Sequence, residues 1–379
     1  MKRKYLVFVL MLIIVFVSFS RSAFAMSYES DHDLQAYLTV EDRVVNKATD
    51  WFVQNYGEFY EIEDLHASLV RSFNNQLKTR YTVAIHCMTR LKAESPAELP
   101  FIRGLYDAVK DKRDDTRPLK AAVDYYAVEI VDFSKDLSPL SVDIVIPVDN
   151  ETKDVNTAEI YIQDGNTTTL YPAVDYELDA QKLYLSGKNS VDEVYSAYQT
   201  AQSSARGFSD YNRIAARDYA LAWVGSNVVG CYDHPLGCSI LQDRTKWNNS
   251  VYYYNSNLVH DDCADFVSQA MSAGGLPEDG SSGSTWFRVK YTYTMAWGAP
   301  WTNVAYMLPY MTSSAHQFWD SSSFAVCNAG NILLTESDHV VMITLNDTVT
   351  HRYTGHTNDK KGVDFYDEAG YQYYAIKTT

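Results

Sequence analysis

The sequence has 379 residues, with 48 acidic and 32 basic side chains and a net charge of −16 at pH 7. This balance argues against binding of nucleic acid through a general electrostatic footprint, because such proteins neutralise phosphates with an excess of Lys and Arg. The length is typical of two domains of ordinary size.

The first 25 residues have the pattern of a secretory signal peptide. Basic residues at positions 2–4 precede an apolar run from Tyr5 to Phe19, and residues 23–25 (Ala-Phe-Ala) have the small–x–small pattern of a cleavage site. The apolar run is shorter than the roughly 20 residues that a membrane-spanning helix needs. We therefore expect a secreted protein, or one at the extracytoplasmic cell surface, with an uncleaved membrane anchor as the lesser alternative. Cleavage would remove four basic and no acidic residues and change the net charge from −16 to −20.

Residues 26–185 predict a small α+β domain of unknown role, in which helices come first and an antiparallel meander follows. Apolar residues recur at helical spacing over 33–56 and about 65–77, and a short helix is expected at Phe101–Val109. Alternating, β-branched and tyrosine-rich stretches then predict strands. These strands are expected at Asp124–Phe133, Leu140–Val148, Ala158–Gln163 and Thr168–Val174.

Residues 186–210 are rich in Ser, Gly, Gln and Asp and predict a linker with some helix, so that residues 211–379 form a second domain. Its first helix is expected at Tyr211–Val224. Another helix begins at Cys263, and Gly274-Gly275 is expected to end it. Three strands are predicted near the C-terminus, at His339–Leu345, Thr348–Thr354 and about Tyr371–Ile376.

Cys263 is the candidate nucleophile. A thiol at the N-terminus of a helix feels the positive end of the backbone dipole, which favours the nucleophilic thiolate. His339 is the candidate base that takes the thiol proton and later protonates the leaving amine, and the backbone N–H of Cys263 could stabilise the oxyanion. The acidic neighbours oppose this chemistry. Asp261 or Asp262 is placed to cap the helix, and together with Asp265 they should raise the thiol pKa unless a protonated His339 lies closer.

Two histidines compete to orient His339. If the hairpin that follows His339 has a two-residue loop at Asn346-Asp347, His356 falls on the strand face of His339 and His351 falls on the opposite face. A longer or bulged loop would reverse this assignment. With the two-residue loop, the sequence predicts that His356 orients His339 through its other ring nitrogen, and His351 is the alternative.

The other cysteines predict at most one disulfide. Cys231 and Cys238 flank a turn-rich loop and could pair, whereas Cys87 and Cys327 are typical of buried thiols. The sequence contains no Cys-x-x-Cys and no His-Glu-x-x-His motif, so neither a metal nor any other cofactor is expected.

The motifs of the second region, taken in order, resemble one family. They are Tyr211-Asn212-Arg213, Tyr219-Ala220, Asp262-Cys263-Ala264-Asp265-Phe266-Val267-Ser268-Gln269, Gly274-Gly275, Trp286, Asp338-His339 and His356-Thr357-Asn358-Asp359. Over about residues 208–379 this set resembles the putative amidase domain of Firmicutes, which looks related to the papain-like NlpC/P60 and CHAP cell-wall hydrolases. The chain departs from that pattern at Ala264-Asp265, where Thr-Asn is usual, and at Gly330-Asn331, where related enzymes often have Gly-Asp.

The resemblance implies a papain-like α+β domain, in which the helix that carries the cysteine packs on an antiparallel sheet. It implies Cys–His hydrolysis of amide or peptide bonds, with peptidoglycan as the substrate class and possible association with the cell wall or the membrane surface. The spacing of the third polar residue in NlpC/P60 enzymes points to His351, whereas the His-Thr motif of the amidase family points to His356. Asp262 and Trp286 are candidates for the substrate groove. The alternative function is a catalytically inactive, secreted module that binds the cell wall or another protein.

Overall fold

The computed structural model describes most of the chain from residue 38 onward. The described residues are 38–112, 116–134, 136–163, 170–203, 211–225, 244–248, 262–278, 284, 286, 298–316, 318–335, 339–356, 359–367 and 370–376. The predicted signal peptide, the Cys231–Cys238 pair and Asp261 lie outside this set. Within it, no helix is long and apolar enough to cross a membrane.

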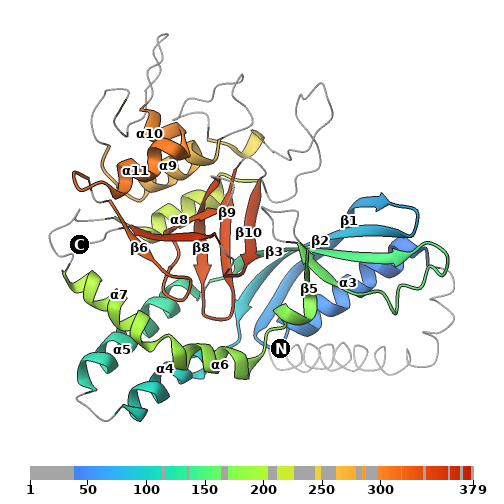
Figure 1. The fold of residues 1–379 in the computed structure, drawn as a ribbon, viewed down its shortest axis with the longest axis horizontal. Helices are drawn as coiled ribbons and strands as arrows, with labels where there is room; N and C mark the ends of the chain where they lie inside the picture. The colour runs from blue at the N-terminus through green and yellow to red at the C-terminus, as the bar shows by residue number, and fades with distance from the viewer. Residues whose placement is uncertain are drawn as a thin grey trace, which may run out of the picture.

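The described residues form a mixed α+β fold on one large, mostly antiparallel sheet (Figure 1). The helices are α3 (Val40–Tyr56), α4 (Pro100–Asp111), α5 (Arg117–Ser134), α6 (Ala180–Asn189), α7 (Val191–Ser203), α8 (Arg213–Ala222), α9 (Cys263–Ala273), α10 (Ala299–Thr302) and α11 (Val304–Thr312). The strands are β1 (Tyr60–Asn74), β2 (Lys78–Leu91), β3 (Ser138–Asp149), β4 (Tyr161–Gln163), β5 (Leu170–Pro172), β6 (Trp319–Ser322), β7 (Ile332–Thr335), β8 (His339–Asn346), β9 (His351–Gly355), β10 (Lys360–Phe365) and β11 (Gln372–Ile376).

The strand order is β1-β2-β3-β10-β9-β8-β7-β11-β6, with β4 and β5 paired beside β3. The β3–β10 pair is parallel, through Val363 and Ser141, and it joins the strands of the N-terminal region to those of the C-terminal region. In Figure 1, strands β8 to β10 run vertically, with α9 to α11 above them and α4 and α6 below. The regions predicted as two domains, 26–185 and 211–379, therefore share one sheet.

A buried arginine reinforces this junction. Arg352 on β9 is fully buried and donates hydrogen bonds to Thr89 Oγ1 on β2 (2.7 Å) and to the Pro139 carbonyl on β3 (3.1 Å). The phenol of Tyr60 lies under its guanidinium, 5.1 Å from ring centroid to Cζ, and donates a 2.7 Å hydrogen bond to Asp347. Because Arg352 needs partners from both regions to be buried, it ties β9 to the N-terminal strands.

The N-terminal region confirms two of the predicted helices. In α3, Val44, Ala48, Phe52 and Tyr56 recur every four residues and are buried, and Thr39 caps the helix. The helix predicted at Phe101–Val109 is part of α4.

Two expectations for this region are wrong. Residues 65–74 belong to β1, because pairing with the β-branched β2 outweighs the ambiguous apolar spacing of that segment. Residues 124–133 lie in α5, where Val123, Ala127 and Ile130 share a buried face at helical spacing. The linker predicted at 186–210 was expected to contain some helix, and residues 186–189 and 191–203 belong to α6 and α7; α7 packs on α5.

In the C-terminal region, α9 begins at Cys263 and ends before the glycine pair, as predicted. Gly275 has φ 92°, a left-handed conformation that favours glycine. A Cβ atom on Gly274 would lie 2.5 Å from the ring of Tyr211, so glycine also allows the start of α8 to approach the end of α9. These contacts give a packing reason for the Tyr211 and Gly-Gly motifs.

The predicted loop of the β8–β9 hairpin is wrong. Asn346 pairs with His351, so the loop has four residues, 347–350, and a bulge lies between Ile343 and Leu345. Ile343 pairs with Tyr353. The side chain of Asp347 accepts hydrogen bonds from the backbone N–H groups of residues 349 and 350, which stabilises the longer loop. The strand face of His339 is therefore shared with Gly355, and His356 lies on the opposite face.

Candidate active site

Cys263 is the first residue of α9 and lies in the core between helices and sheet. Its side chain is a reduced thiol and the residue is 8% exposed. Helix α9 packs on α8, α10, β8 and β9, so every residue from Cys263 to Met271 is buried. Phe266 and Met271 share one apolar cluster with Val340 on β8. The core packing therefore fixes the helix and, with it, the position of the thiol.

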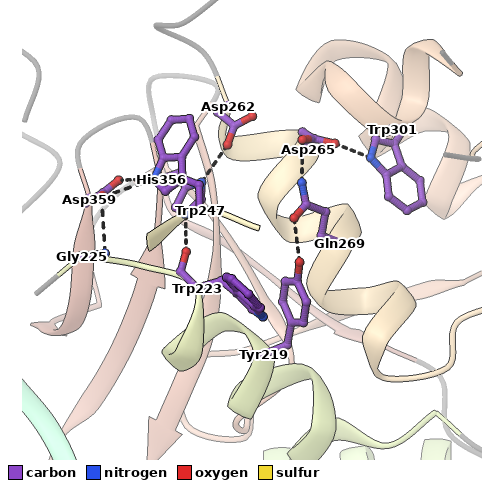
Figure 2. A network of polar contacts seen from close by, with 10 residues as sticks. All are labelled: Tyr219, Trp223, Gly225, Trp247, Asp262, Asp265, Gln269, Trp301, His356 and Asp359. Atoms are coloured by element: carbon purple, nitrogen blue, oxygen red, sulfur yellow. Dashed lines mark hydrogen bonds and ion pairs between the residues drawn. The ribbon is translucent and has the colours of Figure 1, made fainter. Parts of the chain in front are cut away.

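Asp262 occupies the N-cap position of α9 but does not cap it. Its side chain makes no hydrogen bond to the first turn and instead lies 2.7 Å from Nδ1 of His356 (Figure 2). The other ring nitrogen, Nε2, donates a 2.7 Å hydrogen bond to the Trp223 carbonyl at the end of α8. The predicted capping by Asp262 is wrong, and the N-terminus of α9 keeps its partial positive charge beside the thiol.

The His356 ring is sandwiched between two aromatic rings and is 1% exposed. Trp247 stacks on one side at 4.3 Å between ring centroids, and Phe266 of α9 stacks on the other at 3.9 Å. Asp359 accepts a 3.2 Å hydrogen bond from Trp247 Nε1 and a 3.3 Å bond from the Gly225 backbone, which holds the covering indole in place. The sequence gives no sign of Trp247, whereas Asp359 stands in the His-Thr-Asn-Asp motif.

These contacts determine how many protons the Asp262–His356 pair holds. A carbonyl oxygen can only accept, so Nε2 of His356 must carry a hydrogen. The short contact between Nδ1 and the Asp262 carboxyl then needs one further proton, on either atom, and both arrangements give the pair a net charge of zero. Burial lowers the pKa of His356 to about 4, which favours the neutral ring. Asp262 therefore adds no net negative charge beside Cys263.

The second acidic neighbour, Asp265, is also buried and hydrogen-bonded. It accepts a 2.7 Å hydrogen bond from Gln269 Nε2 and a second hydrogen bond from Trp301 Nε1. Gln269 in turn accepts a 2.8 Å bond from Tyr219 on α8 (Figure 2). Burial raises the pKa of Asp265 well above its ordinary value, which favours the neutral carboxyl. The acidic residues near Cys263 thus oppose thiolate formation less than the sequence suggests.

His339 is the first residue of β8 and lies beside Gly355. A methyl group at position 355 would lie 3.8 Å from Nε2 of His339, so the ring contacts the end of β9 directly before His356. Burial lowers the pKa of His339 to about 4. The ring is therefore neutral at pH 7 and can accept a proton. Both ring nitrogens of His356 have other partners, so the predicted hydrogen bond from His356 to His339 is absent from the described contacts.

His351 lies at the other end of the hairpin. It pairs with Asn346, seven residues along β8 from His339, which is about 23 Å at the usual strand rise. Its ring stacks on Phe324 at 3.8 Å between centroids. This separation excludes the alternative in which His351 orients His339.

The sequence predicted that Trp286 lines the substrate groove, and this prediction is wrong. It is fully buried, donates a 2.9 Å hydrogen bond to Ser268 Oγ on α9, and packs against Trp301 with centroids 4.6 Å apart. The Ser268 hydroxyl in turn donates a 2.9 Å hydrogen bond to the Trp301 carbonyl. Trp286 therefore fixes the back of α9, and Asp262, the other groove candidate, faces His356.

The polar groups around α9 form hydrogen-bonded pairs. Among the described residues, no group of three or more His, Cys, Asp or Glu side chains gathers in a way that could hold a metal ion. The start of α9 offers a thiol and the positive end of a helix, and the neutral imidazole of His339 lies at the start of β8. This set suits attack on a carbonyl carbon and proton transfer to a leaving nitrogen.

Comparison with protein families identifies a matching region in the second half of the chain. Residues 210–377 match the family described as the putative amidase domain, which suggests an amidase-type hydrolase. The match covers α8 to β11 and so includes Cys263, His339 and His356. No curated protein and no solved structure matches the chain.

Proposed function

We propose that residues 211–376 form a cysteine-dependent amidase or endopeptidase in which Cys263 is the nucleophile and His339 is the base. The family match supports amide hydrolysis in general. The observation that carries the finer assignment is the Asp262–His356 hydrogen bond, because it fastens the end of β9 to the start of α9. Gly355 directly precedes His356, and a Cβ atom built there would lie 3.8 Å from Nε2 of His339, so Asp262 of α9 and His339 of β8 lie beside consecutive residues of β9.

In this proposal the neutral imidazole of His339 takes the proton of the Cys263 thiol, and the thiolate attacks the carbonyl carbon of the amide. The carbonyl oxygen becomes an oxyanion that the backbone N–H groups at the start of α9 stabilise. The C–N bond then breaks, His339 gives its proton to the leaving amine, and a thioester remains on Cys263. Water, deprotonated by His339, hydrolyses the thioester and releases the carboxylic acid.

We assign a positioning role, and no proton transfer, to His356. Both of its ring nitrogens are occupied and its faces are covered by Trp247 and Phe266, so it cannot shuttle protons to a substrate. It fixes the Asp262 carboxyl away from the first turn of α9. This keeps the N–H groups of that turn available for the oxyanion and removes the net charge of Asp262 from the neighbourhood of the thiol.

We further propose that the substrate is a peptide or amide bond of peptidoglycan, reached after export through residues 1–25. The resemblance to NlpC/P60 and CHAP hydrolases supports the substrate class, and the basic start, apolar run and Ala-Phe-Ala segment support export. The alternative remains an inactive secreted module that binds the cell wall or a protein. The burial of Cys263, at 8% exposed, is the observation that favours it.

Thiol labelling and hydrolysis separate the two functions. Burial raises the pKa of Cys87 and of Cys327 to about 12, so both are built-in controls for an inert thiol. We expect iodoacetamide to label Cys263 faster than these two at pH 7, as followed by peptide mass spectrometry. We also expect residues 26–379 to release fragments from peptidoglycan, and Cys263→Ala to release none.

Cys327→Ala is the matched control, because it removes a buried thiol that belongs to a different apolar cluster from α9 and should keep the activity. Equal fragment release by the wild type and Cys263→Ala would refute the enzymatic function, as would labelling of Cys263 no faster than Cys327. Binding of peptidoglycan without hydrolysis in both proteins would favour the inactive module.

A further inference from the structure

The β1–β2 hairpin exposes large apolar side chains near its turn. Phe73 is 61% exposed, Leu77 is 76% exposed, and Val70, at a bulge in β1, is 56% exposed. All three lie outside the apolar clusters of the core. In Figure 1 the hairpin extends to the right of the view, away from α9 and from strands β6 to β9. Residues 70–80, which we call the hairpin tip, therefore group exposed apolar side chains at one end of the fold, rather than scattering them singly.

The turn of the hairpin tip is held in a defined conformation by polar groups. The Asn75 side-chain oxygen accepts hydrogen bonds from the backbone N–H groups of Leu77 (3.0 Å) and Lys78 (2.7 Å). The Leu77 carbonyl accepts a 2.9 Å bond from the backbone N–H of Asn150, whose side chain donates a 2.7 Å bond to the Asn75 carbonyl. The backbone of Leu77 is thus fixed on both sides while its side chain stays exposed to solvent.

Three cations accompany the apolar side chains. Arg71, Lys78 and Arg80 are exposed, and among the residues that the structure describes none of them forms an ion pair. Phe73 pairs with Arg80 across the hairpin, and Arg71 is two residues from Phe73 along β1, so these three side chains share one face of the sheet. The hairpin tip contains no Asp or Glu, although the chain has a net charge of −16.

Two carboxylates on the neighbouring β3 turn do not neutralise the hairpin tip. Asp149 pairs in register with Lys78, and its Oδ1 atom accepts hydrogen bonds from the backbone N–H groups of residues 151 and 152. Glu151 follows in the same turn. Against three cations, these two carboxylates leave this end of the sheet with a net positive charge. Because charges further away than about 8 Å are largely screened at physiological ionic strength, an approaching surface senses this end rather than the acidic chain as a whole.

We propose that the hairpin tip binds to an anionic lipid surface, with Phe73 and Leu77 at the boundary between headgroups and acyl chains and with the three cations on lipid phosphates. The apolar side chains gain free energy by leaving water, and the cations gain it from the negative surface potential. Arg and Lys can also lay their apolar stems along this boundary while their charged ends stay among the headgroups. So small a contact should bind reversibly.

Other partners fit the hairpin tip less well. A soluble polyanion would use the cations but leave Phe73 and Leu77 in water. A second copy of the chain, pairing with β1 as an added strand, would need a regular edge, and bulges at residues 63–66 and 69–71 interrupt the pairing pattern of β1. A lipid surface uses both kinds of side chain and needs no regular edge.

Vesicle sedimentation with residues 26–379, which lack the apolar run at 5–19, tests the proposal. We expect binding to vesicles of phosphatidylglycerol and phosphatidylcholine in equal parts to be about tenfold stronger than binding to phosphatidylcholine alone. Phe73→Ser combined with Leu77→Ser should weaken binding to the mixed vesicles about tenfold. Tyr306→Ser is the matched control, because it removes an aromatic side chain that is 58% exposed on α11 and should leave binding unchanged.

A second set of variants tests the charges. Arg71→Gln combined with Lys78→Gln and Arg80→Gln should bind the two kinds of vesicle equally. The control removes the same number of positive charges from exposed lysines of α4 and α5, and it should bind as the wild type does. It combines Lys110→Gln, Lys112→Gln and Lys120→Gln.

Equal binding of the wild type to both kinds of vesicle would overturn the proposal, as would no binding to either. Unchanged binding of the Phe73 and Leu77 double variant would show contact through phosphates alone and would also overturn it. So would a dimer in sedimentation velocity without lipid that this double variant loses, because the hairpin tip would then bind a second copy. Circular dichroism establishes that each variant is folded. Binding is read without any amide substrate, so these outcomes do not depend on hydrolysis by Cys263.

Discussion

Replacing Asp262 by Asn and by Ala tests whether its carboxyl acts through a hydrogen bond or through its charge. The His356–Trp223 bond requires a hydrogen on Nε2, so Nδ1 either accepts from a protonated Asp262 or donates to an ionised one. We favour the neutral form, because burial lowers the pKa of His356 to about 4. An Asn side chain can donate an N–H to Nδ1 from nearly the same position. It therefore mimics the protonated Asp262 beside a neutral ring, but it cannot mimic an ionised Asp262 beside a protonated ring.

The two substitutions should therefore differ in magnitude. In Asp262→Asn the bond to His356 remains, and we expect the free energy of unfolding to change by less than about 1 kcal/mol. In Asp262→Ala the buried Nδ1 atom loses its partner while the Trp247 and Phe266 rings still cover it, which should cost about 2 kcal/mol. The rate of amide hydrolysis should stay within a few-fold of wild type in the Asn variant and fall by at least tenfold in the Ala variant.

Urea unfolding at pH 7 and the rate of peptidoglycan hydrolysis measure the two effects. Asp218→Asn is the matched control, because it neutralises a carboxyl that is 57% exposed and pairs only with the adjacent Arg217 among the ion pairs described here. If Asp262→Asn is folded but as inactive as Asp262→Ala, the charge of the carboxylate is essential and the neutral pair is wrong.

Three further substitutions test the positions of His339, His351 and Arg352. Gly355→Ala would place a methyl group 2.7 Å from Val341 Cγ1 and against the His339 ring, so we expect a destabilisation of about 1–3 kcal/mol and a loss of hydrolysis; full activity would contradict the contact. The His351 pKa of about 3 lies below its ordinary value, so the unfolded chain binds more protons between about pH 3 and 6.5, and His351 removes stability as the pH falls through that range. The free energy of unfolding of His351→Phe, relative to that of the wild type, should therefore rise by about 2 kcal/mol when the pH is lowered from 6.5 to 5, as measured by urea unfolding. The same relative stability at both pH values would argue against a neutral buried ring. Arg352→Met removes a buried cation that faces two carboxylates and the carbonyls of β3, and we expect a loss of about 3–5 kcal/mol, seen as a lower urea midpoint; an unchanged midpoint would show that the arginine is not needed at the junction.

Local patterns in the sequence were sufficient for elements whose own residues determine them. Helix α9 could be predicted because its apolar spacing is regular and glycine ends it. The strand that begins at His339 follows from a β-branched run. Both predictions rest on interactions within a few residues, where propensity and periodicity act.

The arrangement of the site could not be predicted, because it depends on a one-residue bulge in β8. Asp347 binds two backbone N–H groups of its own loop, which has four residues, but this even change in length keeps the faces of β9. The one-residue bulge between Ile343 and Leu345 reverses them. A period of two makes the whole strand sensitive to such a shift. His356 consequently reaches Asp262 on α9, and no local signal in the sequence links two residues that are 94 positions apart.

The family match begins at residue 210, but the physical support of the site begins earlier. His356 is placed by β9, and β9 is held by Arg352, whose hydrogen-bond partners lie on β2 and β3. Strand β10, the neighbour of β9, completes its pairing with β3 through Val363. Without the N-terminal strands, β10 would expose an unpaired edge and Arg352 would be a buried cation without its partners. The N-terminal region therefore positions the residues next to Cys263 through the shared sheet, although it contributes no side chain to the proposed reaction.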